Sequence, residues 1–184
     1  MKRYALLTLL LFIFSCAPLI CPEEQQIKQR YSYDSAPQRY TAYASVSYGV
    51  IKFPFVIKKE GASYLVEAGT RGSFSFNIDG VCVNGVCLDL PFSPDGIIFG
   101  AVLRGDEKAS CQIGHTVVER DDGSFRQRFY FAEGQLQKVE VLDKKRDKLV
   151  VLTYGPRTKE GFYRRVKVDY GDISLVVNVD EVRY

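Results

Sequence analysis

The chain has 184 residues and a formal net charge of +3 at pH 7, and 46% of its residues are hydrophobic. That hydrophobic content is too high for a disordered chain, and the length suits one domain. Phe and Tyr occur 12 times each, Trp is absent and His occurs once. A single His excludes most hydrolase triads and any multi-histidine metal site. The aromatic and β-branched residues favour a small β protein that binds something over an enzyme.

The N-terminus has the pattern of an export signal. Met1-Lys2-Arg3 is a short positive head, and residues 5–14 form an almost unbroken apolar run. This run is too short to cross a hydrocarbon core of roughly 30 Å as a helix, so we interpret it as the apolar region of a signal peptide. It ends at Ile13-Phe14-Ser15-Cys16, which resembles a bacterial lipobox. We therefore expect residues 1–15 to be a lipoprotein signal peptide and Cys16 to be lipidated.

An ordinary signal peptide followed by a chance cysteine is the alternative. Cys21 is a poorer lipidation site because the preceding residue, Ile20, is bulky. Residues 16–184 then form one domain, in which 16–39 are a tether and a short helix. Acyl chains on a cysteine anchor a protein to a membrane by apolar burial alone.

The charge balance after processing is nearly even. Loss of Lys2 and Arg3 leaves 23 of the 25 basic residues against 22 acidic ones. Such a balance gives no electrostatic case for nucleic acid. The basic run at residues 144–148 is more simply explained as a charged turn than as an anion-binding site.

The other cysteines fit an oxidising compartment. Residues 81–88 are expected to form a hairpin on Asn84-Gly85, because Asn-Gly is the strongest short-range signal for a type I′ turn. Cys82 and Cys87 then face each other at a distance that a disulfide spans. Cys21 and Cys111 are left to pair by elimination.

Zinc binding is the alternative for these cysteines. Cys82, Cys87, Cys111 and His115 together have the composition of a Cys₃His set. The hairpin explains the first two without metal, and exported thiols usually oxidise. We therefore expect no metal site, and we expect His115 to be a surface residue at the start of a strand.

From about residue 40 onward, apolar and polar residues alternate in short runs, which is the pattern of half-buried strands. In one run Ile51, Phe53, Phe55 and Ile57 share a face, with lysines on the other. Gly-bearing turns recur about every 8–12 residues, which predicts consecutive antiparallel hairpins. The runs amount to roughly ten or eleven strands without βαβ alternation.

Two segments break this alternation. Residues 22–30 begin with Pro and carry acids in the first turn, which predicts a short helix. Ser93 and Pro94 have the pattern of a helix N-cap and first residue, and Gly105 that of a C-cap. Apolar residues occur on nearly all sides of this second helix, so we expect it to be buried against the sheet.

The expected fold class is mainly β with minor α. One helix cannot cover a sheet of ten strands, so the sheet must curl. We predict a curled antiparallel meander of about 10–11 strands forming an unclosed half-barrel, with a short N-terminal helix and one inserted helix.

A half-barrel of this kind encloses either a cavity or a filled core. Aromatic side chains on its inner face would suit acyl chains. The candidates for a cavity lining are Phe53, Phe55, Phe74, Phe76, Phe129 and Phe131. In the alternative, the same side chains fill a core and bind nothing.

The pattern resembles the LolA/LolB-like lipoprotein-localisation factors of the bacterial envelope. The resemblance covers residues 22–184 and is carried by residues 43–48, 64–74 and 149–184, together with the lipobox and the inserted helix. It implies an unclosed barrel capped by helices, whose apolar cavity receives acyl chains of lipoproteins. It also implies a lipid-anchored location at the outer membrane, facing the periplasm, in agreement with the absence of Asp after Cys16.

Two features depart from that family. A loop of the family's receptor projects an apolar residue before a Gly, and the matching position here is Arg71, where a charge argues against insertion into a membrane. The helical insertion at residues 94–104 is also shorter than in the family.

The sequence therefore predicts an envelope lipoprotein that binds acyl chains or lipoproteins, and that receives or transfers lipoproteins at the outer membrane. The alternative is a structural lipoprotein that presents its strands to an envelope protein partner and has a filled core. No catalytic motif is found: G-x-S-x-G, P-loop and G-x-G-x-x-G are all absent. Asp121-Asp122-Gly123 is more simply a turn than a carboxylate pair, so we expect no enzyme activity and no cofactor.

Overall fold

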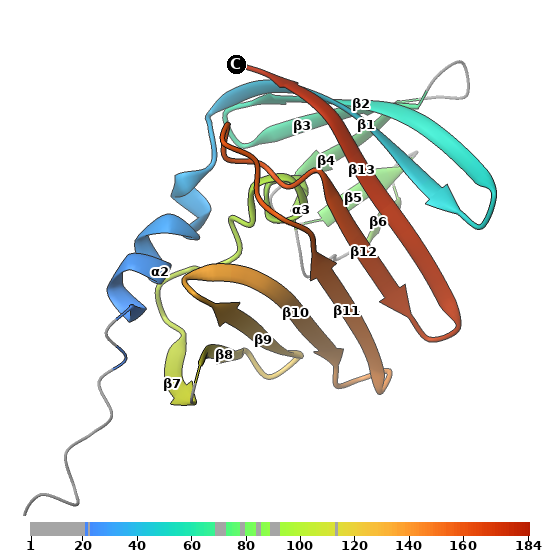
Figure 1. The fold of residues 1–184 in the computed structure, drawn as a ribbon. Helices are drawn as coiled ribbons and strands as arrows, with labels where there is room; N and C mark the ends of the chain where they lie inside the picture. The colour runs from blue at the N-terminus through green and yellow to red at the C-terminus, as the bar shows by residue number, and fades with distance from the viewer. Residues whose placement is uncertain are drawn as a thin grey trace, which may run out of the picture.

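A single curled sheet dominates the computed structural model, which describes residues 21, 23–68, 73–77, 80–83, 86–88, 93–112 and 114–184. Within these residues, thirteen strands follow the order β6-β5-β4-β3-β2-β1-β13-β12-β11-β10-β9-β8-β7, and each pairs antiparallel with its neighbours. The end strands β6 and β7 do not pair with each other, so the sheet is not closed (Figure 1). The predicted mainly-β, unclosed half-barrel is confirmed, with a few more short strands than the expected ten or eleven.

Two consecutive meanders make up the sheet. The first contains β1 (Arg39–Tyr48), β2 (Ile51–Glu60), β3 (Ser63–Glu67), β4 (Ser73–Asn77), β5 (Gly80–Val83) and β6 (Val86–Leu88). The second contains β7 (Lys108–Gln112), β8 (His115–Asp121), β9 (Phe125–Ala132), β10 (Gln135–Asp143), β11 (Lys148–Tyr154), β12 (Arg165–Tyr170) and β13 (Ile173–Arg183). Pairing of β13 with β1 joins the two meanders into one surface.

The N-terminal helix forms where the sequence predicts it. Helix α2 (Glu24–Arg30) buries Ile27, and a short 3₁₀ turn, η2 (Tyr33–Ser35), follows it. Tyr31, directly after α2, is fully buried against Phe131 at 5.1 Å between ring centroids. The helix thereby covers the second meander.

The inserted helix begins as predicted but ends earlier. Helix α3 (Pro94–Phe99) has Ser93 as its N-cap, whose hydroxyl accepts a hydrogen bond from the Gly96 N–H at 3.3 Å. The expected end at Gly105 is wrong, because Gly100 takes a left-handed conformation (φ 72°) and caps the helix. A side chain at Gly100 would also meet the Tyr163 ring at 3.0 Å. The chain then turns away, and Leu103 pairs with Ser32.

The core is divided into two clusters of buried residues. One lies between α2 and strands β8–β12 and includes Tyr31, Phe129, Phe131 and Leu152. The other lies between α3 and strands β1, β2, β3 and β13. Ile97 of α3 packs against both clusters, so this short helix, which Figure 1 shows inside the curve of the sheet, connects the two parts of the core.

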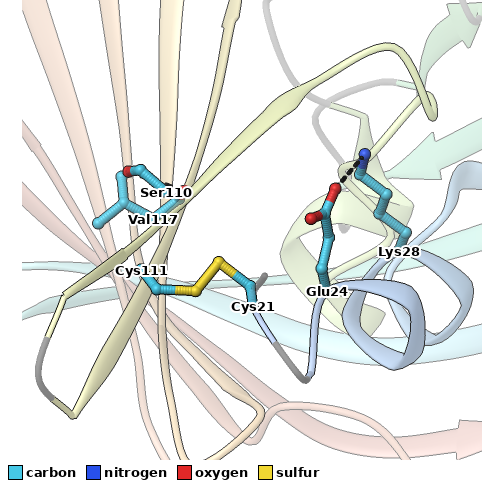
Figure 2. Close-up of a disulfide and its surroundings, with 6 residues drawn as sticks. All are labelled: Cys21, Glu24, Lys28, Ser110, Cys111 and Val117. Carbon is cyan, nitrogen blue, oxygen red and sulfur yellow. Dashed lines mark hydrogen bonds and ion pairs between the residues drawn. A yellow bond between two sulfur atoms is a disulfide. The ribbon is translucent and has the colours of Figure 1, made fainter. Parts of the chain in front are cut away.

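A disulfide links the start of α2 to the edge strand β7. Cys21 and Cys111, the pair reached by elimination, are bonded with 5.6 Å between their Cα atoms (Figure 2). Two turns of α2 are further tied by the Glu24–Lys28 ion pair at 2.8 Å. Since Cys111 is oxidised, it cannot serve as the third thiolate of a zinc site.

The predicted cysteine hairpin is seen in the backbone. Strands β5 and β6 place the Cα atoms of Cys82 and Cys87 opposite each other, as expected from the turn at Asn84-Gly85. Their side chains, and therefore the predicted bond between them, lie outside the described residues, as do residue 16 and the loop carrying Arg71. His115 is exposed at the start of β8. No helix in the described part of the chain is long and apolar enough to cross a membrane.

Replacing Cys21 and Cys111 by Ser should destabilise the fold. The bond joins residues 90 positions apart, and closing a loop of that length in the unfolded chain stabilises a protein by up to about 4–5 kcal/mol. Urea unfolding of the oxidised protein, followed by circular dichroism, measures the difference. An unchanged midpoint in the double variant would show that the bond does not constrain the chain.

Candidate functional site: an apolar trough beside helix α3

A buried carboxylate fixes α3 inside the half-barrel. Asp95, in the first turn of α3, accepts three hydrogen bonds from the sheet: Tyr40 Oη at 2.8 Å, Lys59 Nζ at 2.6 Å and Tyr64 Oη at 2.7 Å. Both members of the Lys59–Asp95 ion pair are almost completely buried, with side-chain exposures of 5% and 4%. A buried carboxylate needs such a full set of donors, because an unpaired one is costly to desolvate.

Strand register brings these three donors together. Tyr40 of β1 lies opposite Lys59 of β2, and Lys59 lies opposite Tyr64 of β3. The three side chains therefore point to the same face of the sheet, in one row across three strands. The Lys59 ammonium lies 5.9 Å and 5.6 Å from the centroids of the Tyr40 and Tyr64 rings, which adds a cation–π contribution.

The two tyrosines that bond Asp95 have raised pKa values. Burial, together with the hydrogen-bonded Asp95 carboxylate, raises the pKa of Tyr40 and of Tyr64 well above 10.0. Both hydroxyls are therefore donors throughout the physiological pH range, so the cluster carries one carboxylate and one ammonium.

The second meander holds α3 from the other side. Tyr154 of β11 donates its hydroxyl proton to the Gly96 carbonyl at 2.9 Å, and the Tyr163 N–H donates to the Ile98 carbonyl at 2.8 Å. The small residues Ala42 and Ala44 of β1 lie in the cluster that packs against the helix. The helix is thus bonded to both halves of the sheet, although it has only six residues.

An apolar cavity lies between α3 and the sheet. Its volume is about 150 Å³. Its wall is almost entirely aliphatic and comes from β1, β2, β3, β13 and α3: Ala44, Val46, Phe55, Ile57, Val66, Ser93, Pro94, Ile97, Ile98, Val177 and Val179. A cavity of roughly this size and character stays dry and holds a small apolar group.

The apolar surface continues from this cavity to the end of the sheet. Along β13 the residues of the concave face change from buried Val179 and Val177 to Ile173, which is 46% exposed. Along β2 they change from buried Ile57 through half-buried Phe55 to Phe53, which is 50% exposed.

We call this exposed part of the concave face the trough. Its members are Tyr48 of β1, Ile51 and Phe53 of β2, Tyr170 of β12 and Ile173 of β13. Pairing of Tyr48 with Ile51 and of Tyr170 with Ile173 places all five at the same end of the sheet. Exposed apolar side chains gathered in this way mark a surface for a ligand or a partner.

The predicted lining residues lie in different parts of the structure. Phe55 contributes to the cavity wall and Phe53 to the trough. Phe129 and Phe131 are instead each 1% exposed and fill the other core cluster, so they do not line this cavity. The side chains of Phe74 and Phe76, in β4, lie outside the described residues.

Sequence reasoning missed the residues that position the helix. Lys59 continues the apolar alternation of β2 beyond Ile57, which was the available signal that it points inward. Its partner Asp95 follows the recognised N-cap pattern at Ser93 and Pro94. The alternation of apolar and polar residues within each strand could not show that these two charges meet.

The comparisons with known proteins give structural likenesses only. No family model matches the sequence, and no curated protein matches it. A solved structure described as an outer membrane lipoprotein-sorting protein domain, from Vibrio parahaemolyticus, has a TM-score of 0.47 at 12% identity, covering 87% of this chain and 89% of that one. A DUF1329 family protein from Desulfovibrio piger has a TM-score of 0.45 at 12% identity, with the same coverages.

Replacing Lys59 by Met should destabilise the protein strongly, by about 3–5 kcal/mol, because it leaves the Asp95 carboxylate buried without its counter-charge. Lys58→Met is a matched control on the same strand, since Lys58 pairs with Glu67 at 2.9 Å with both side chains about half exposed. That exposed pair should contribute less than about 1 kcal/mol. Urea unfolding compares the two variants, and equal losses would contradict the role given to the buried pair.

Stability should also fall at alkaline pH. Burial is the main cause of the raised pKa values of Tyr40, Tyr64, Tyr154 and Tyr163, whose ordinary value is 10.0. Above that pH the unfolded chain releases these protons while the folded chain retains them, so the free energy of unfolding decreases as pH rises. Urea midpoints at about pH 8 and about pH 11 test this, and the tyrosinate absorbance of the buried tyrosines should appear only on unfolding. Tyrosinate formed by all tyrosines in the folded state would contradict it.

Proposed function

We propose that this chain is a lipid-anchored protein of the bacterial envelope that binds an acyl chain along its concave face. The observation that carries the proposal is the continuity of the apolar trough with the cavity beside α3. The cavity alone, at about 150 Å³, is smaller than the roughly 300 Å³ at which small-molecule sites begin. A long, thin apolar ligand that ends in the cavity and lies along the trough suits the two features together.

The chemistry of the concave face supports this ligand class. The wall beside Ile97 and Val177 has few polar groups that could select a polar molecule, and apolar burial is not directional. The Asp95 cluster lies at the end of the sheet opposite the trough, where its two hydroxyls and its ammonium each donate to the carboxylate that fixes α3. In this proposal the cargo is the acyl part of a lipoprotein, received or transferred at the outer membrane, as the resemblance to localisation factors implies.

Replacing Ile173 by Glu should weaken binding of a fluorescent fatty acid by at least about tenfold, because a carboxylate in the trough must be desolvated beside the chain. Leu149→Glu is the matched control. Leu149 is also 46% exposed and lies at the same end of the sheet, but strand alternation places it on the convex face.

Both positions are exposed, so both variants should keep the far-ultraviolet circular dichroism of the parent chain. The proposal predicts that Leu149→Glu binds the fatty acid within about twofold of the parent, as expected for a surface charge. Absence of binding by the parent chain, or equal loss in both variants, would refute the concave face as the site.

Replacing Cys16 by Ala should release the protein from the membrane fraction. The lipobox-like Ile13-Phe14-Ser15-Cys16 sequence supports acylation at this thiol, and the acyl chains would supply the anchor. Fractionation together with metabolic labelling by palmitate reports the change relative to the parent chain. An anchored and labelled Cys16→Ala protein would rule out this attachment point.

A second function is favoured by one specific observation. Val50, at the β1–β2 turn next to the trough, is fully exposed. An exposed apolar side chain at a turn can also bind a protein partner. In this alternative the chain is an interaction lipoprotein of an envelope assembly. Two results together would favour this alternative. The parent chain would take up no fatty acid, and the Val50→Asp variant would lose an envelope partner that crosslinks to the parent chain.

A further inference from the structure

Two arginines at the opposite end of the sheet have no acidic partner. Of the eleven arginines in the described residues, six lie within ion-pair distance of a carboxylate, and five do not: Arg30, Arg104, Arg157, Arg164 and Arg165. Among these five, Arg30 and Arg157 line the same groove. The Nε–H of Arg157 donates to the Gly161 carbonyl at 2.7 Å, which uses one of its five N–H donors. The side chain of Arg30, the last residue of α2, makes no hydrogen bond within the described part of the chain.

One aromatic platform holds both guanidinium groups. The Cζ atoms of Arg30 and Arg157 lie 5.8 Å and 5.5 Å from the centroid of the Tyr31 ring, and that of Arg157 lies 6.0 Å from the Tyr163 ring. Tyr31 and Tyr163 are almost completely buried, and their hydroxyl groups lie 3.4 Å apart. The platform is therefore rigid, and two like charges that contact it line the same groove.

Both arginines and Tyr163 line a groove of about 490 Å³. Arg30, Arg157, Gln135 and Gln137 supply its donors, and no Asp or Glu lines it among the described residues. Glu160, in the same loop, accepts a hydrogen bond from the Thr158 hydroxyl, but it is exposed and outside the groove wall. An anion between the two guanidinium groups would relieve their mutual repulsion and take up their unused donors.

We propose that this groove binds a phosphate group. Two planar guanidinium groups and neutral donors match its several acceptor oxygens. Membrane lipid headgroups are the expected source, because α2 begins eight residues after Cys16, the proposed anchor. Only this choice of source rests on the proposed function; the groove itself lies away from the trough, at the end of the sheet where α2 packs.

Isothermal titration of the full-length chain in a non-ionic detergent tests the site with two probes, inorganic phosphate and the short-chain lipid dihexanoyl phosphatidylglycerol. Replacing both Arg30 and Arg157 by Gln should weaken phosphate binding at least about tenfold. Arg126→Gln with Arg128→Gln removes the same charge from the outer face of β9, where both arginines pair with Glu119. That control should change the affinity by less than about twofold.

The two probes separate the sources of the phosphate. Tighter binding of the lipid, lost in the Arg30 and Arg157 variant, assigns the groove to a headgroup, and equal affinities assign it to free phosphate. Binding that is unchanged in this variant, or absent from the parent chain, overturns the proposal. Lipid binding lost only in Ile173→Glu also overturns it, while supporting the trough.

Discussion

The buried Asp95 carboxylate is the constraint on which the concave face depends. A helix of six residues has too few internal hydrogen bonds to be stable alone, so its position must come from tertiary contacts. Asp95 supplies these contacts by accepting three hydrogen bonds from adjacent strands, and the Tyr154 hydroxyl bonds the next residue of the helix from the other meander. Without this arrangement Ile97 and Ile98 would have no fixed place, and the cavity that they help to line would have no defined shape.

The same arrangement explains why the trough is left open. All the polar anchors of α3 lie toward one end of the sheet, where Tyr40, Lys59 and Tyr64 form their row. The helix consequently covers Val177 and Val179 but does not reach Ile173. A half-barrel that was merely filling its core would be expected to cover the apolar side chains of its inner face, because their exposure is unfavourable. In the proposed function, a bound ligand or partner covers this exposed end.

The sequence predicted the fold well, because each strand carries its own signal. Alternation of apolar and polar residues depends on backbone geometry within one strand, so β2 and β13 could be recognised alone. The start of α3 was predictable from Ser93 and Pro94 for the same local reason. Its end was not, since Gly100 and Gly105 are both suitable caps, and the choice depends on the close approach of Tyr163.

The candidate site was harder to predict because it depends on which element covers each face. Phe55 and Phe129 have the same pattern in sequence, yet α3 leaves space beside the first while α2 and Tyr31 fill the space beside the second. The Lys59–Asp95 pair joins residues 36 positions apart, and it becomes visible only when the register of β1, β2 and β3 is known. Charge placement across strands is therefore the information that the local pattern lacks.

Photo-crosslinking of a fatty acid tests the central claim most directly. A diazirine at the end of the acyl chain, activated in the exported protein and mapped by peptide mass spectrometry, should label residues around the cavity, such as Ile97 and Val177. A diazirine at mid-chain should label the trough, at Phe53 or Ile173. Labelling confined to the convex face around Leu149, or none above that of an unrelated protein, would contradict an acyl-binding concave face.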